Sequence, residues 1–531
     1  MSEAPNPVHM SSGADTRWTT VNFAEAIQGV QTPLGWSFWS LAMETSVRRT
    51  FGGLGALSNA DVPVPESADD RISGIFYGRV AGNINTFRRV GDNMPGASGD
   101  QIEEQLFGVV PDVATKKAKS SYLRYPVVAV KMPRAAMKPG RQIPAMRAEY
   151  RQWWQRATLD NPPQDLVTAQ ALMRDAAQRF IDIGEPHATA TMLASSLLDQ
   201  LTAMSKKALG EPELAMTLAT GYGGMEETGL LGDILKCAKD ELDVEDVARK
   251  HGYHGFDEGN LASHSWREDR AGLESFIRGY KRPGVVGPAE REAKQTARRV
   301  EAEKRLLAAL PFYRRSAAKL TMKLAAKFMP LRELGKASFL HTVDAARCAA
   351  RTAGRLLHEP GVLEDPEDIF FLTYDEFVSD PAAAAEHVAE RKANDKRYRR
   401  MELPPSWAGV PVATEIPTEV AEREATNEIK GIGVVGDTVT GRARVITDPL
   451  DADLDDGDIL VCGTTDPSWT PLFMLVDALV IDMGGAMSHG AIVARELGVT
   501  CVINTVTGTK DIPDGATITV NGATGVVTID G

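Results

Sequence analysis

A short apolar run followed by two glycines and a helical pattern constrains the fold of this chain more than any other feature. Residues 478–481 read Ala-Leu-Val-Ile and suit a buried strand, and the glycines at 484–485 supply a turn after it. Apolar residues then recur at helical spacing from 491 to 497, and Gly498 suits a helix end. The order predicts a strand, a turn and a helix, with His489 at the start of that helix.

A histidine at a helix start lies beside unpaired backbone N–H groups and the positive end of the helix dipole, which together favour a phosphate group. We therefore interpret His489 as a nucleophile that carries a phosphoryl group, with one ring nitrogen reactive and the other held by a partner. This role needs an exposed ring. Gly484, Gly485, Ser488 and Gly490 are the expected phosphate loop, although Ser488 equally suits a helix cap. The alternative is a histidine that only caps or packs.

The whole string from Gly484 to Gly498 resembles the swivelling phosphohistidine domain of the phosphoenolpyruvate-utilising enzymes. That family includes phosphoenolpyruvate synthase, pyruvate phosphate dikinase and rifampicin phosphotransferase. Met487 stands where the synthases and dikinases have a regulatory threonine, and Thr500 stands where proline is usual. Since drug-phosphotransferase members also lack that threonine, the resemblance favours their branch. The loop from Thr464 to Thr470 resembles the family segment that lies beside the phosphohistidine.

Length and charge exclude several classes of function. A chain of 531 residues exceeds one ordinary core, so we expect about two to four domains. The net charge of -13 argues against a nucleic-acid or membrane partner. Four scattered cysteines without a CxxC pair indicate reduced thiols and no metal site. No signal layout or long apolar run is apparent, so we expect a cytoplasmic protein.

The pattern along the chain predicts a multidomain α+β protein. We expect a disordered N-terminus at 1–19 and a large, mainly helical substrate-binding domain at 20–400. A proline-rich linker at 401–428 should lead to a compact swivelling β/α phosphohistidine domain at 429–531. Within these domains we expect a new helix at Pro330, a turn and short strand at 363–372, a helix at 382–400, strands at 441–446, 458–462, 478–481 and 501–503, and a hairpin turned at Asn521-Gly522.

Two N-terminal segments are candidates for binding the substrate. Trp36, Phe38 and Trp39 follow a proline turn and form a pocket or, equally, a hydrophobic core. Their run resembles the start of the substrate-binding domain of rifampicin phosphotransferase. His254 and Glu258 belong to a stretch that resembles a second family segment, but two arginines of that segment are absent here. A phosphate-clamping role there is therefore in doubt, and the histidine spacing fits no zinc site.

A third segment matches the family better. Arg332, Glu333 and Lys336 resemble the family's Arg-Glu-x-x-Lys helix, and the two cations are four residues apart on one helical face. Cationic donors stabilise the charge on a transferring phosphoryl group, and Glu333 would orient Arg332 or take a proton from the acceptor. The alternative for such residues is a solvated, charged helix face.

The resemblance implies the phosphocarrier and substrate-binding subunit of a two-component dikinase, such as hydroxyphenylethanone dikinase or phenylphosphate synthase. No nucleotide-binding segment is apparent, so ATP and Mg²⁺ are expected mainly on a separate ATP-grasp subunit. The phosphoryl group would pass through His489 to a hydroxyl of a small acceptor, for which the aromatic residues favour a phenol. The alternatives are an antibiotic- or pyruvate-directed phosphotransferase of the same family and a non-catalytic regulatory homologue.

Overall fold

The computed structural model describes residues 6–530, except for 22, 24–26, 96–97, 108–121, 224–225, 283–286, 417–426, 450–451, 456 and 486–487. Met487 and part of the predicted linker thus lie outside the described residues. By their internal contacts the residues form two compact units. Unit 1 comprises 1–189, 259–263 and 335–420, and unit 2 comprises 190–258, 264–334 and 421–531. The predicted domain boundaries at 20–400 and 429–531 stay a prediction.

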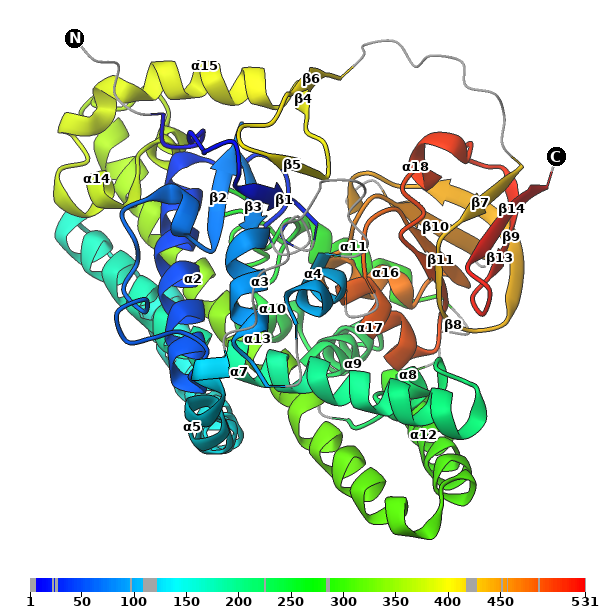
Figure 1. The fold of residues 1–531 in the computed structure, drawn as a ribbon. Coiled ribbons are helices and arrows are strands. Elements are labelled where there is room, and N and C mark those ends of the chain that lie inside the picture. Colours follow the sequence, from blue (N-terminus) through cyan, green and yellow to red (C-terminus); the bar gives the residue numbers. More distant parts are fainter. Residues whose placement is uncertain are drawn as a thin grey trace. The chain divides into compact units, whose positions relative to one another are not determined.

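Unit 1 contains a four-stranded antiparallel sheet in the order β2-β3-β1-β5 (Figure 1). The strands are β1 (Arg17–Thr19), β2 (Ser73–Phe76), β3 (Arg79–Asn83) and β5 (Ser406–Ala408). Trp18 is fully buried against Phe76, and Phe76 also contacts Trp407. These aromatic contacts explain why chain segments so distant in sequence pair here.

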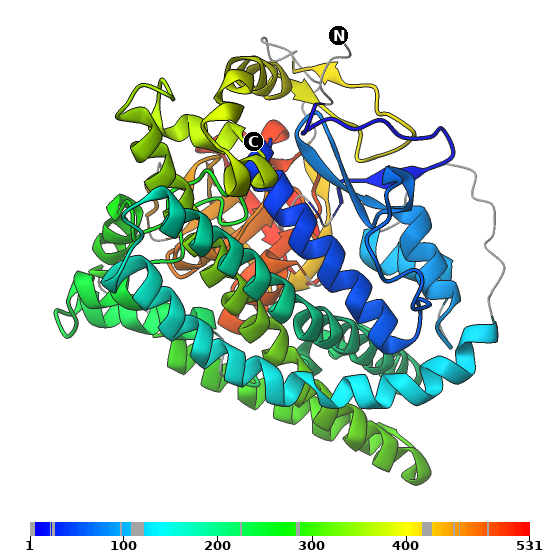
Figure 2. The same cartoon turned by 90° about the vertical axis from the view of Figure 1, so that its left-hand side faces the viewer.

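Helices make up most of the rest of unit 1. They include α2 (Pro33–Leu54), α3 (Ile84–Asp92), α4 (Gly99–Phe107), α5 (Tyr125–Met137), α6 (Pro139–Gln155), α14 (Tyr374–Ser379) and α15 (Val388–Tyr398). Two long helices, α7 (Leu166–Leu209) and α13 (Phe312–His358), contribute residues to both units. In unit 1 the blue helix α2 lies against both of them (Figure 2), because Trp39 contacts Phe180 and Phe339. A short ladder of β4 (Met401–Glu402) and β6 (Thr414–Glu415) completes this unit.

Unit 2 is built on an eight-stranded sheet in the order β7-β14-β13-β9-β10-β11-β12-β8. Its central strands, β9 (Thr438–Val445), β10 (Asp458–Cys462), β11 (Ala478–Ile481) and β12 (Thr500–Ile503), run parallel. Every residue of the last three is buried, as expected for parallel strands covered on both faces. The antiparallel flanks are β7 (Glu428–Lys430), β8 (Ile432–Val435), β13 (Thr517–Asn521) and β14 (Val526–Asp530).

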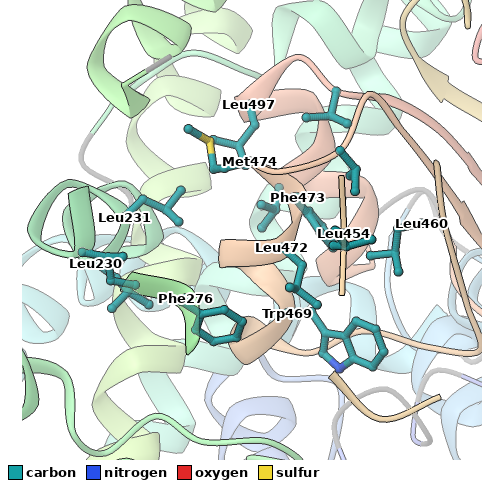
Figure 3. Packing of buried hydrophobic residues seen from close by; sticks show 14 of the residues in the cluster. Leu230, Leu231, Phe276, Leu454, Leu460, Trp469, Leu472, Phe473, Met474 and Leu497 are labelled. Carbon is teal, nitrogen blue, oxygen red and sulfur yellow. The ribbon is translucent and has the colours of Figure 1, made fainter. Parts of the chain in front are cut away.

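The helices of unit 2 are α8 (Leu214–Leu218), α9 (Glu226–Ala238), α10 (Val244–His251), α11 (Ala271–Tyr280), α12 (Pro288–Ala309), α16 (Thr470–Phe473), α17 (His489–Leu497) and α18 (Gly508–Asp511). Of these, α9, α10, α11, α16 and α17 pack on this sheet through one large apolar cluster. It joins residues such as Leu231, Phe276, Trp469, Phe473 and Leu497 (Figure 3). The cluster is continuous from the helical segment 230–280 to the strands. Burial of this size is the main contribution to the stability of the unit.

The predicted fold class is confirmed: a mainly helical region precedes a compact β/α region. The strands at 458–462, 478–481 and 501–503 are also confirmed, and β9 covers most of the predicted strand at 441–446. All four cysteines are buried, and none of them forms a disulfide. In the described part of the chain, no helix has the length and apolar character needed to cross a membrane.

Several local predictions are wrong. Pro330 lies inside α13 and does not begin a helix, because apolar packing on both sides of it, from Phe328 and Leu331, outweighs the lost backbone hydrogen bond. Pro366–Phe371 forms a 3₁₀ helix instead of a strand, since Asp365 and Asp368 cap its first turn reciprocally.

Three further predictions need correction. Arg17–Thr19 is ordered in β1 and not disordered, because Trp18 anchors it. Ser406–Ala408, assigned to the linker, is strand β5 of the unit 1 sheet. The closing hairpin pairs Asn521 with Val526, so its loop has more residues than the predicted tight turn, and the Asn521 side chain accepts hydrogen bonds from two loop amides.

Candidate active site

Helix α17 begins at His489, as the sequence predicts, directly after β11 and the glycine turn. Ser488 is its N-cap: the hydroxyl oxygen accepts a hydrogen bond from the amide of Ala491 at 3.3 Å. Gly498 ends the helix in the left-handed conformation, with φ of 68°. Ser488 thus has the capping role that its sequence position allowed.

Both nitrogens of the His489 ring face threonine hydroxyls. Nε2 lies 3.2 Å from Oγ1 of Thr470, and Nδ1 lies 3.4 Å from Oγ1 of Thr465. Both threonines belong to residues 464–470, here called the threonine loop, which follows β10. The phenyl ring of Phe473 lies 6.2 Å away, centroid to centroid. A neutral imidazole has one N–H and one lone pair, so hydroxyl groups at both nitrogens hold the ring in a defined orientation.

The His489 ring is buried, with 8% of the residue exposed. The prediction of an exposed ring is therefore wrong for this structure, because the threonine loop covers the ring. Gly490 permits the close approach. A Cβ atom at this position would lie 2.5 Å from Cδ1 of Ile481 and 2.8 Å from Oγ1 of Thr465. Any side chain here would push α17 away from the threonine loop.

Asp466, a residue of the threonine loop, stabilises the loop through hydrogen bonds. One carboxyl oxygen accepts hydrogen bonds from the amide (2.8 Å) and hydroxyl of Ser468, and the other accepts from the amide of Glu258 at 3.4 Å. Burial, with the negative charge of Glu258 adding to it, raises the pKa of Asp466 to about 7. Apart from the likeness of its loop to a family segment, no pattern in the sequence indicates this buried carboxyl group.

His254 and Glu258 form a buried pair next to Asp466. Nδ1 of His254 lies 2.5 Å from Oε1 of Glu258, and each residue is 2% exposed. Burial opposes the charge on His254, but the carboxylate of Glu258 outweighs it and raises the pKa of the imidazole. The structure thus brings these two predicted binding residues together, close to the threonine loop. Their role in binding a substrate stays a prediction.

The opposite end of α17 also carries buried charge. Arg495 is 6% exposed, and burial lowers its pKa to about 10. The carboxylate of Glu496 accepts two contacts from the amide of Gly221, at 3.0 and 3.1 Å, and burial raises its pKa to about 7. Arg495 is therefore not the surface cation that is usual for such a helix position.

A cavity of about 40 Å³ lies beside this end of α17, lined by residues that include Ile492, Arg495, Glu496, Arg332 and Glu333. His489, Ile492 and Glu496 occupy one helical face by their spacing, so the cavity lies along the same face as the histidine. A volume of this size holds water molecules but not a drug-sized ligand.

Arg332, Glu333 and Lys336 all lie in α13, as predicted. A guanidinium nitrogen of Arg332 lies 3.6 Å from the carboxylate of Glu333. Arg332 and Glu333 belong to unit 2, whereas Lys336 falls in unit 1 because the division passes between 334 and 335. Their catalytic role stays a prediction.

The aromatic trio in α2 lies in the interior of unit 1. Trp36, Phe38 and Trp39 are 8%, 0% and 4% exposed. The indole N–H of Trp39 donates to the carbonyl of Gly259 at 2.7 Å, and its ring packs edge-on against Phe180. These contacts are those of a hydrophobic core, so a role in substrate binding stays a prediction.

Two family models match segments of the chain. The mobile domain of PEP-utilising enzymes matches residues 454–525, which contain the threonine loop and α17. The fourth domain of rifampicin phosphotransferase matches residues 200–333, which contain His254, Glu258 and Arg332. In these two segments the chain resembles the PEP-utilising enzymes. Both matched segments belong to unit 2, apart from residues 259–263.

Curated proteins extend the likeness. A rifampicin phosphotransferase of Streptomyces sp is 30% identical over 366 residues, covering 65% of this chain and 42% of that protein. The rifampicin phosphotransferase of Bacillus subtilis is 36% identical over 207 residues, covering 38% of this chain and 24% of that protein. An uncharacterised protein of Mycobacterium tuberculosis is 36% identical over 210 residues, covering 40% of this chain and 24% of the relative. The chain therefore spans less than half the length of these relatives.

A solved structure, the NMR structure of the Enzyme I (nEIt) protein, aligns with 63% of this chain and 79% of its own. The identity is 13% and the TM-score is 0.16. A score this low carries no argument about the fold.

Proposed function

We propose that this chain is the phosphocarrier and substrate-binding subunit of an ATP-dependent dikinase. The observation that carries the proposal is the setting of His489, which begins α17 and has a threonine hydroxyl at each ring nitrogen. One threonine oxygen would accept the ring N–H and so leave the lone pair on the other nitrogen for attack on phosphorus. The N–H groups of the first turn of α17 would stabilise the phosphoryl oxygens.

ATP with Mg²⁺, bound mainly on a separate ATP-grasp subunit, would supply the phosphoryl group and leave as AMP and phosphate. The residues of this chain would then hold and transfer it. Because His489 is 8% exposed and the threonine loop covers its ring, that loop would have to open for a donor or an acceptor to reach the ring. We propose that the β/α region carries the ring between donor and acceptor by swinging on the part of the predicted linker at 401–428 that follows β6.

Arg332, Glu333 and Lys336 would act in the second transfer, from the phosphohistidine to a hydroxyl of a small acceptor. The guanidinium fork and the ammonium group would stabilise the charge on the moving phosphoryl group. The contact of 3.6 Å between Arg332 and Glu333 supports an orienting role for the carboxylate. Our proposed acceptor is a phenol, as inferred from the sequence, and the aromatic trio of α2, which packs in the core of unit 1, does not add to that inference.

A second candidate is an antibiotic-directed phosphotransferase. It is favoured by the match of residues 200–333 to the fourth domain of rifampicin phosphotransferase. The two candidates share the carrier chemistry and differ only in the acceptor, so a screen of phenols against rifampicin as acceptors separates them.

The carrier role is tested by labelling. Chemical loading with phosphoramidate needs no partner subunit: a ring nitrogen attacks phosphorus, the P–N bond breaks, and ammonia leaves. We expect acid-labile, base-stable phosphate on His489 in the natural chain and none in His489→Ala. His251→Ala serves as the histidine control and should still be labelled. Equal labelling of the natural chain and His489→Ala would overturn the proposal.

A further inference from the structure

Asp466 joins the threonine loop to the segment that contains His254 and Glu258. Its carboxyl group accepts from the amide and the hydroxyl of Ser468 on one side, and from the amide of Glu258 on the other. Asp466 is 4% exposed and Ser468 is fully buried. The side chain therefore determines the shape of the threonine loop and attaches it to a separate segment of unit 2.

The two hydroxyls that face His489 lie on either side of this attachment. Thr465 precedes Asp466 directly, and Thr470 follows Ser468 by two residues. Thr470 begins the short helix α16, which follows the 3₁₀ turn Pro467–Trp469. A shift of Asp466 would move both hydroxyls together, and with them the hydrogen bonds to both ring nitrogens.

We propose that Asp466 is a positioning residue for His489, and that its uncharged form holds the threonine loop against Glu258 so that Thr465 and Thr470 orient the imidazole ring. This inference rests on the proposed carrier function. It adds a residue that touches neither the phosphoryl group nor the reacting nitrogen and acts only through the two threonines.

The charged groups around Asp466 explain why its ionisation would weaken the contact between the threonine loop and Glu258. The charged groups that face it are Glu258 and Asp257, and both carboxylates raise its pKa, whereas the donors from Ser468 lower it. His254, paired with Glu258 at 2.5 Å, partly offsets the negative charge. Ionised Asp466 would thus meet like charge in a buried place, which favours separation of the loop from Glu258.

The pH dependence follows from the pKa of Asp466, which is about 7. At pH 6 about nine-tenths of the group is uncharged, and at pH 8 about one-tenth. If only the uncharged form positions the loop, the loading of His489 in the natural chain falls about tenfold between these pH values for this reason alone.

The experiment compares the natural chain with Asp466→Asn, which keeps the size of the side chain and one accepting oxygen and stays uncharged at every pH. Loading of His489 by phosphoramidate is followed by mass spectrometry from pH 6 to pH 8. We expect the rate ratio of Asp466→Asn to the natural chain to rise from about 1 at pH 6 to about 10 at pH 8. Asp453→Asn, an exposed control in the same region, should give a ratio of 1 throughout. A ratio for Asp466→Asn that does not change with pH would overturn the proposal.

A second readout keeps the inference separate from the carrier function. The ¹⁵N chemical shifts of the His489 ring report its hydrogen bonds whether or not it is phosphorylated. We expect these shifts to change in the natural chain between pH 6 and pH 8 with a component near pH 7 that is absent in Asp466→Asn. Identical titrations in both proteins would overturn the positioning role. Absence of label in every protein, with the component near pH 7 present, would instead overturn only the carrier function.

Discussion

Glu44 of unit 1 differs in its partners from two carboxyl groups of unit 2, Asp466 and Glu496, although unit 2 also contains the buried pair of His254 and Glu258. In unit 1 the carboxylate of Glu44 lies 2.6 Å from the guanidinium of Arg48, both almost fully buried, and also accepts from the amides of Ile72 and Ser73. In unit 2 Glu496 accepts from an amide, and Asp466 accepts from amides and a hydroxyl. Their pKa values are raised to about 7.

This difference distinguishes groups that stay ionised at all moderate pH values from groups whose charge changes near neutral pH. In a buried ion pair each charge stabilises the other, so both groups stay charged over a wide pH range. A buried carboxyl group with only neutral donors gains or loses a proton near pH 7, and its surroundings respond. The family matches at 200–333 and 454–525 fall in the unit that contains the second kind.

Breaking the buried pair of unit 1 should have the largest effect. Glu44→Ala leaves the guanidinium of Arg48 buried without its carboxylate, which costs about 3–5 kcal/mol of unfolding free energy. Urea unfolding measures this cost. Glu66→Ala, at an exposed position of the same unit, is the control and should cost less than about 0.5 kcal/mol. A loss below about 1 kcal/mol in Glu44→Ala would remove the contrast between the units.

Removing a cation from α13 should slow transfer without affecting loading. For Arg332→Ala and Lys336→Ala we expect His489 to accept phosphate normally and to pass it to the acceptor about 100- to 1,000-fold more slowly. A single-turnover chase of labelled protein measures this step, with the exposed Lys323→Ala as control on the same helix. Discharge at the natural rate in both variants would assign these residues to a solvated helix face.

Replacing Glu496 should flatten the pH dependence of stability. The folded-state pKa of about 7 lies above the usual 4.5, so the stabilisation is complete below pH 4.5 and is lost as the pH rises through 7. The shift corresponds to about 3 kcal/mol across this window. The difference between the unfolding free energies at pH 5 and pH 8 should therefore be smaller in Glu496→Gln than in the natural chain, by up to about 3 kcal/mol. Glu301→Gln, at an exposed site in α12, is the control and should show the same pH dependence of stability as the natural chain. The same pH dependence in Glu496→Gln would contradict the burial of the Glu496 carboxyl group.

Removal of a helix cap should have the smallest effect on stability, and one cap in each unit allows a direct comparison. Thr32→Ala removes the cap of α2 in unit 1, and Ser488→Ala removes the cap of α17 in unit 2. Each should cost about 1 kcal/mol of unfolding free energy. Only Ser488→Ala should also slow the loading of His489 by phosphoramidate, because only this cap adjoins the ring. Equal loading rates in the two variants would show that the cap does not orient the imidazole.

Local patterns in the sequence were sufficient for the strand, turn and helix around His489. The apolar run, the glycines and Ser488 act over a few residues, so β11 and the start of α17 follow from them. Pro330 shows where such reasoning fails, since packing from distant residues carries α13 through a position that alone favours a helix start.

The groups around the histidine are the part that sequence did not reveal. The burial of His489 and the contact between Asp466 and Glu258 join residues far apart in the chain. No spacing rule relates residue 258 to residue 466, and an aspartate before a proline more commonly indicates a turn. Their proximity follows only from the packing of the helical segment on the sheet of unit 2.

The buried thiols provide an internal measure of how readily each unit opens. Cys462 and Cys501 lie in β10 and β12 of unit 2, and Cys348 lies in the part of α13 that belongs to unit 1. A buried thiol reacts with an alkylating reagent only while its surroundings are transiently open, so its modification rate reports the free energy of that opening. In the natural chain, without any engineered label, the alkylation of Cys348 against that of Cys462 therefore ranks the local stabilities of the two units in one experiment.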